Sequence, residues 1–75
     1  MKNFTIIEEI FVGIENGISM KRVEIMCDSD KDIPEPETEW ATGSCAYSIE
    51  TGTFYLLKSS GKWINNDTHV EELLS

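Results

Sequence analysis

The chain has 75 residues, 40% of them hydrophobic, and its six basic against fourteen acidic residues give a net charge of −8. A chain this short forms one domain at most and buries only roughly 60% of its unfolded surface, which argues against a large catalytic cleft. The negative charge is the wrong sign for attraction to nucleic acid or to an anionic membrane surface, so we expect neither as a partner. No apolar run approaches the ~18 residues of a membrane span, and the N-terminus lacks the features of a secretory signal, so we expect a soluble protein.

Residues 1–27 are predicted to form a β-hairpin. The segment from Phe4 to Val12 is rich in β-branched and aromatic residues, which favours a strand. Residues 13–17 contain two glycines and an asparagine, which tolerate the positive φ of a chain reversal. The second half of the segment from Ile18 to Cys27 alternates apolar and polar residues and therefore predicts the second strand.

Residues 28–42 are predicted to be an acidic linker. Six of the fourteen acidic residues lie between Asp28 and Glu39. Pro34 and Pro36 oppose both helix formation and strand pairing. We therefore expect an extended, solvated connection.

Residues 43–64 are predicted to form a three-stranded meander. Cys45, Tyr47 and Ile49 alternate with smaller or polar residues, which is the period of a half-buried strand. Turn-forming residues follow at 51–52 and 59–61, and each is followed by another strand-like segment.

Residues 67–74 are predicted to form a short helix, because Thr68 and Glu71 have the spacing of a capping box and three apolar residues share one helical face. We therefore expect residues 1–75 to form one mainly β domain. Its small antiparallel sheet would combine the hairpin and the meander, with the helix at the C-terminal end.

Catalytic chemistry is not indicated. Cys27 and Cys45 are too few for a disulfide scaffold, and we favour two buried thiols, with a disulfide or a metal site as alternatives. The only histidine, His69, would have to approach a thiol to form a catalytic pair. Because no nucleophile elbow, glycine-rich phosphate loop or pair of carboxylates on a rigid element is present, we predict no enzymatic activity, no catalytic residue and no cofactor.

The acidic segment resembles a calcium-binding loop only in part. Four acidic residues have the spacing of ligand positions one, three, five and twelve of such a loop. The position that requires glycine is Ile33, however, and Pro34 and Pro36 occupy two further positions. We therefore predict no metal site.

Aromatic residues gather in the C-terminal half of the chain, and half-covered aromatic side chains are common anchors of protein contacts. The segment from Phe54 to Leu57 is apolar on both sides of a strand, which indicates that both sides are covered. The sequence leaves open whether these side chains form the core or line an interface. The candidate interface residues are Trp40, Tyr47, Phe54, Tyr55, Leu57 and Trp63.

A family resemblance rests on the order of several short segments between about residues 20 and 64: Asp32-Ile33-Pro34, the run from Trp40 to Tyr47, Glu50-Thr51-Gly52, the run from Phe54 to Leu57, and Gly61-Lys62-Trp63. This order resembles small structural proteins of tailed bacteriophages and prophages, in particular the base domain of phage head fibre proteins. The resemblance implies a non-enzymatic virion component that attaches to a capsid or tail protein, often as a homotrimer. Its location would be the virion, and the host cytoplasm during assembly.

Two functions therefore follow from the sequence. The first is a self-associating phage structural or accessory protein, for which attachment or assembly fits better than receptor binding, because a fibre protein continues into a long shaft. The alternative is a monomeric acidic binding or inhibitor module of prophage origin, whose surface imitates nucleic acid. The concentration of acidic residues in one linker favours the first.

Overall fold

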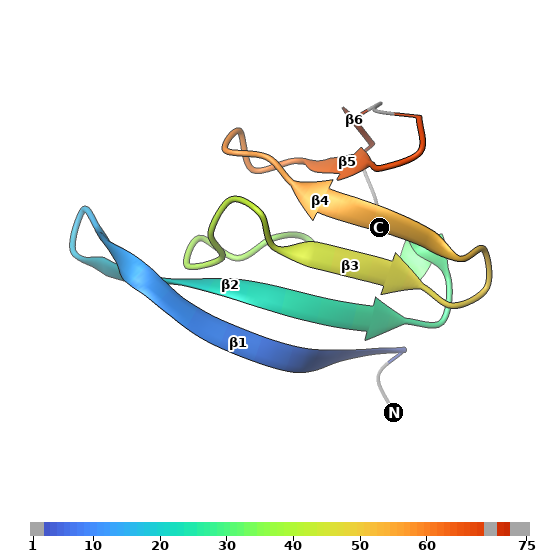
Figure 1. Cartoon of the computed structure of the whole chain (residues 1–75), viewed down its shortest axis with the longest axis horizontal. Coiled ribbons are helices and arrows are strands. Elements are labelled where there is room, and N and C mark those ends of the chain that lie inside the picture. The colour runs from blue at the N-terminus through green and yellow to red at the C-terminus, as the bar shows by residue number, and fades with distance from the viewer. Residues whose placement is uncertain (1–2, 69–70, 73–75) are drawn as a thin grey trace.

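The computed structural model describes residues 3–68 and 71–72. In that part of the chain the regular structure is almost entirely β, and the strands join into one sheet (Figure 1). They follow one another across the sheet in chain order: β1 (Phe4–Glu15), β2 (Ile18–Cys27), β3 (Cys45–Ser48), β4 (Thr53–Leu57), β5 (Trp63–Asn65) and β6 (Glu71–Glu72). The prediction of a mainly β protein is confirmed.

The N-terminal hairpin and the C-terminal strands are joined by a parallel pairing. β2 and β3 run parallel, with Glu24 opposite Cys45 and Cys27 opposite Ser48. The other pairs of neighbouring strands in the described residues are antiparallel. The prediction of a purely antiparallel sheet is therefore wrong. The cause is the connection, because residues 28–44 cross back along the sheet before β3 begins, and parallel strands require such a long crossover.

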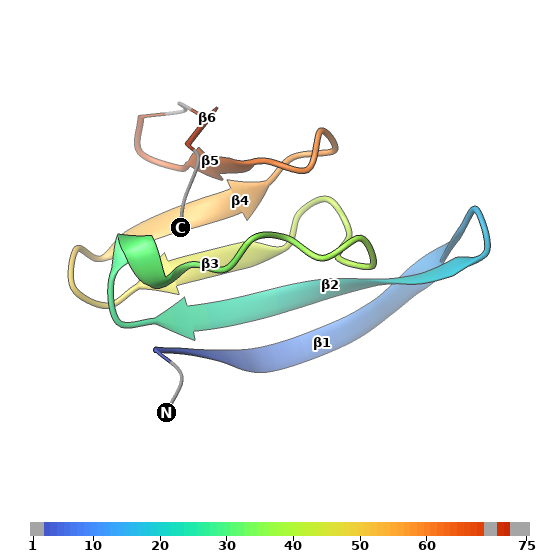
Figure 2. The same ribbon diagram turned by 180° about the vertical axis from the view of Figure 1, so that it is seen from behind.

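This crossover, residues 28–44, covers one face of the sheet (Figure 2). It contains the 3₁₀ turn η1 (Asp30–Asp32). Ile33, directly after this turn, is fully buried, and Trp40 is buried near the end of the crossover. Lys21 of β2 holds the last part of the crossover, since its N–H donates to the carbonyl of Glu39 at 2.8 Å. The expectation of an extended, solvated connection is therefore wrong where Ile33 and Trp40 are buried, whereas Asp28, Glu35 and Glu37 of the same segment are exposed.

The hydrophobic core lies between the crossover and the covered face of the sheet. It consists of Val23, Ile25, Cys27, Ile33, Trp40, Ala46, Tyr55, Leu57 and Trp63. The alternation in the second half of β2 therefore predicts burial correctly. Each large apolar side chain that is fully buried contributes about 1.5–3 kcal/mol to stability.

β3 is half-buried, as its alternation predicts, but through its smaller side chains. Ala46, Ser48 and the preceding Ser44, the last residue of the crossover, are fully buried. The Ser44 hydroxyl donates to the carbonyl of Ala41 at 2.8 Å and accepts the N–H of Val23 at 3.0 Å. Small side chains on this face allow the crossover to approach the strand closely, and their hydroxyls have partners there, so they can be buried without an unpaired polar group.

The predicted hairpin is present, and its turn lies at Asn16 and Gly17, both with positive φ (50° and 79°). β1 is longer than predicted and continues to Glu15. Its pairing with β2 shifts register beside Ile7 and again beside Val12, which marks two irregularities of the β-bulge kind in the edge strand.

The described residues do not form the C-terminal helix predicted over residues 67–74. Glu71 and Glu72 form β6 instead, paired antiparallel with β5, while residues 69–70 and 73–75 lie outside the described residues. The Asn65 side chain accepts the N–H groups of Asp67 and Thr68 at 2.8 and 3.1 Å, a local turn that reverses the chain toward β5. A two-turn helix without packing is marginal, so strand pairing replaces it.

Candidate protein-contact surfaces

The sheet has one covered face and one open face. Residues directly opposite each other on neighbouring strands share a face. Two rows of such opposite residues therefore lie on the face away from the core. One row runs from β2 through β3 to β4, and the other runs from β3 through β4 to β5. The apolar members of these rows form what we call the open-face patch: Met26, Tyr47 and Phe54 in one row, and Cys45, Leu56 and Ile64 in the other.

The open-face patch is apolar and substantially exposed. Phe54 is 49% exposed, Leu56 39% and Met26 37%. The rings of Tyr47 and Phe54 lie side by side, with centroids 4.7 Å apart. Arg22 and Glu24 also lie on this face and form an ion pair at 3.8 Å, and the register places Glu8 of β1 opposite Glu24. The patch is therefore an apolar surface with charged residues beside it on β1 and β2.

The predicted interface residues divide between the two faces. Four of the six, Trp40, Tyr55, Leu57 and Trp63, belong to the core. Trp63 is fixed there by its Nε1–H, which donates to the carbonyl of Pro34 at 3.0 Å, and by an edge-to-face contact with Trp40 at 6.4 Å between centroids. The other two predicted residues, Tyr47 and Phe54, lie on the open face.

Sequence reasoning missed the other members of the patch, Met26, Cys45, Leu56 and Ile64. The alternation of side chains along β2 was a signal that identifies the face of Met26. Because Val23, Ile25 and Cys27 share the buried face, Met26 must point to the opposite one.

A second apolar surface lies on the hairpin of β1 and β2, which projects beyond the shorter strands of the sheet (Figure 1). We call six of its exposed apolar residues the hairpin arm: Ile7, Ile10, Phe11, Val12, Ile14 and Ile18. Phe11 is 64% exposed and Ile14 68% exposed. β1 has no described neighbour on its outer edge, so these side chains gain little cover from their own sheet.

The acidic residues of η1 serve as structural anchors. Asp30 accepts hydrogen bonds from Ser48 at 2.6 Å, from Thr51 at 2.8 Å and from the Tyr55 hydroxyl. Partial burial acts to raise the pKa of Asp30, but the hydrogen bonds from Ser48, Tyr55 and Thr51 outweigh it and hold the pKa below its usual value. The carboxylate thus ties the crossover to β3 and β4.

Asp32 extends this anchoring toward the N-terminal end of β1. It accepts hydrogen bonds from Ser29 at 2.8 Å and from the Asn3 side chain at 3.2 Å, and these bonds lower the pKa of Asp32. The calcium-loop spacing therefore coincides with carboxylates that bind hydroxyls and amides of their own chain. Within residues 3–68 and 71–72, no group of three or more His, Cys, Asp or Glu side chains is arranged to hold a metal ion.

The two thiols are free and lie on opposite faces of the sheet. Cys27 is buried in the core, whereas Cys45 is half-buried on the open face. Burial, assisted by Asp32, Asp30 and Asp28, raises the pKa of Cys27 to about 11. Burial and Glu24 likewise raise the pKa of Cys45, while Arg22 opposes them. Neither environment favours a thiolate nucleophile, and His69 lies outside the described residues.

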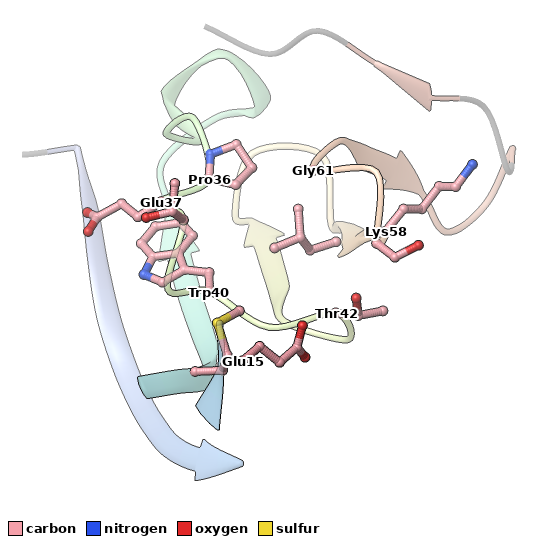
Figure 3. A pocket seen from close by; sticks show the side chains of 11 residues that line it. Glu15, Pro36, Glu37, Trp40, Thr42, Lys58 and Gly61 are labelled. Atoms are coloured by element: carbon pink, nitrogen blue, oxygen red, sulfur yellow. The ribbon is translucent and has the colours of Figure 1, made fainter. Parts of the chain in front are cut away.

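A groove of ≈ 290 Å³ lies between the turn end of the hairpin, the end of the crossover and the turn after β4 (Figure 3). Trp40 and Leu57 contribute apolar lining, while the exposed Glu15, Glu37 and Lys58 lie among its other lining residues. Charges of both signs are mixed along the groove, and no described nucleophile and base converge there. We therefore assign it no ligand.

Comparisons with known proteins return no match: no family model, no curated protein and no solved structure is similar to this chain. The residues that the structure describes include no helix of the length and apolarity needed to cross a membrane. The surfaces of the sheet are therefore the observations on which a function can be built.

Proposed function

We propose that this chain is a non-enzymatic structural protein that self-associates through apolar surfaces of its sheet and attaches to a larger particle. The observation that carries the proposal is the open-face patch, in which Met26 of β2 and Phe54 and Leu56 of β4 are exposed on the same face, on either side of β3. Contiguous exposed apolar surface on a small domain marks a contact site, because leaving it in water forfeits about 25 cal/mol for each Å² that could be buried.

The particle that we propose is a phage or prophage virion, with a capsid or tail protein as the partner and a homotrimer as the assembled form. The support is the resemblance to head fibre base domains. Its glycine-containing segments fall at turns of the fold, since Gly43, Gly52 and Gly61 all have positive φ (94°, 69° and 82°) between strands. These segments thus specify the turns of a β scaffold, as expected of a structural component.

Light scattering coupled to size-exclusion chromatography tests self-association. We expect a mass that is a multiple of 8.5 kDa, three-fold for the favoured trimer. A monomer that persists at high micromolar concentration would contradict the proposal. Quantitative mass spectrometry of purified virions from an induced host tests attachment, and finding the chain only in the soluble lysate would remove the virion role.

A second candidate is a monomeric acidic module that binds a basic protein. The observation in its favour is that the crossover presents exposed acidic residues, including Asp28, Glu35 and Glu37. Salt separates the two functions. Binding of a basic partner weakens as salt is added, whereas self-association of chains with charge −8 strengthens because their mutual repulsion is screened.

A further inference from the structure

The structure points to a specific contact within the assembly. We infer that the open-face patch of one copy packs against the open-face patch of a second copy, with the acidic crossovers on the outside. This inference rests on the proposed self-association and identifies the surface through which it occurs. In a trimer, the same patches would face the shared axis and contact those of the neighbouring copies.

The size of the face is suited to such a contact. The two longer dimensions of the molecule are 36 and 28 Å, and its thickness is only 17 Å. Each broad face is therefore bounded at roughly 1,000 Å², and a stable interface needs about 800 Å² from each partner. Contact over most of the face would reach this size, whereas the thin sides of the molecule are smaller.

The distribution of charge selects the open face over the covered one. Six of the fourteen acidic residues belong to the crossover, which lies over the covered face. On the open face, the strand register places Glu8 and Glu24, and Arg22 forms an ion pair with Glu24. Two chains of charge −8 repel each other least when their crossovers are farthest apart, and this occurs when the open faces meet.

Pairing through the β1 edge of the sheet is disfavoured. β1 is an edge strand, and its register shifts beside Ile7 and Val12 interrupt the regular backbone spacing that a second strand would need. Irregularities of this kind are a common protection of sheet edges. Side-chain contact across the open face is therefore a better route to association than pairing along β1.

The two cysteines allow the contact to be measured in the unmodified protein. Cys45 lies within the patch and Cys27 lies in the core, so alkylation should report association at Cys45 and folding at Cys27. At mildly alkaline pH, we expect the alkylation rate of Cys45 to fall by at least about tenfold as the protein is concentrated through its association range, because only free protomers react. Cys27 should stay protected throughout.

Two variants with the same charge change locate the contact. Phe54→Glu places a carboxylate in the patch, and Phe11→Glu places one on the hairpin arm, at a side chain that is even more exposed. We expect association to weaken by at least about 30-fold in Phe54→Glu and by less than about threefold in Phe11→Glu. Continued protection of Cys27 shows that each variant is folded. If Phe54→Glu unfolds, Phe54→Ser repeats the test without a new charge.

The possible outcomes separate the inference from the proposed function. An oligomer that Phe54→Glu disrupts and Phe11→Glu preserves, with Cys45 protected, supports both. An oligomer disrupted only by Phe11→Glu, with Cys45 equally reactive at all concentrations, overturns the face-to-face contact and leaves self-association intact. A wild-type monomer overturns the proposed function itself.

Discussion

The two faces of the sheet have nearly the same apolar character, but one is buried and the other is exposed. Within β4, Tyr55 and Leu57 are buried, whereas the neighbouring Phe54 and Leu56 are 49% and 39% exposed. The strand itself does not explain this difference, since all four side chains are large and apolar. The crossover does, because residues 28–44 cover one face only. Burial in this chain is thus decided by a connection distant in sequence.

The largest expected contrast comes from truncating one aromatic side chain on each face. Trp63→Ala should lower the free energy of unfolding by about 3–5 kcal/mol, because it leaves a cavity beside Trp40 and removes the bond to the Pro34 carbonyl. Phe54→Ala should lower it by less than about 1 kcal/mol in the dissociated protomer. Urea denaturation at a concentration below association measures both. Equal losses would mean that the open face is covered within the protomer.

The hairpin and the strands of the meander are predictable because local signals specify them. Asn16 and Gly17 adopt the positive φ that a tight turn requires. Val23 and Ile25 are buried as their alternation indicates. These features depend on residues close in sequence, so the sequence is sufficient to identify them.

The parallel pairing of β2 with β3 and the burial of one sheet face under the crossover are not predictable from such local signals. Pro34 and the acidic residues around it are typical of a solvated loop, and only the tertiary structure shows that Ile33 enters the core beside them. Ser44 and Ser48 likewise resemble a solvent-facing row, although their hydroxyls find partners in or beside the crossover. A polar residue with a partner can be buried, and the partner is not visible from local sequence.

The same limit applies to the candidate interface. The sequence identifies the apolar strands correctly, but Tyr55 and Phe54 are equivalent until the crossover distinguishes them. Of the six predicted residues, only Tyr47 and Phe54 lie on the open face. The surface could be found only by combining register with the position of the cover.

Replacing Asp30 tests what holds the crossover on the sheet, with a smaller expected effect on stability. Asp30→Ala removes the acceptor shared by three hydroxyl groups, one of them on the buried Ser48, so stability should fall by about 2 kcal/mol. Asp28→Ala is the matched control, because Asp28 is exposed, and its effect should stay within about 0.5 kcal/mol. Thermal unfolding of the two variants side by side measures the difference. Similar stabilities would show that the Asp30 hydrogen bonds add little to docking of the crossover.

Acidification should weaken the docking of the crossover on the sheet, and it should lower the free energy of unfolding by a smaller and graded amount. The pKa of Asp30 and the pKa of Asp32 both lie below the usual aspartate value of 3.8 in the folded chain. A carboxylate whose folded pKa is depressed stabilises the fold fully above its unfolded pKa and loses that contribution as the pH falls through the folded pKa. We therefore expect unfolding stability to be flat with respect to these groups at neutral pH and to decline below about pH 4. In Asp30→Ala the decline should be shallower, since one of the two groups no longer titrates. An identical slope in the variant would assign the acid sensitivity to other carboxylates and remove Asp30 from the link between pH and the covered face.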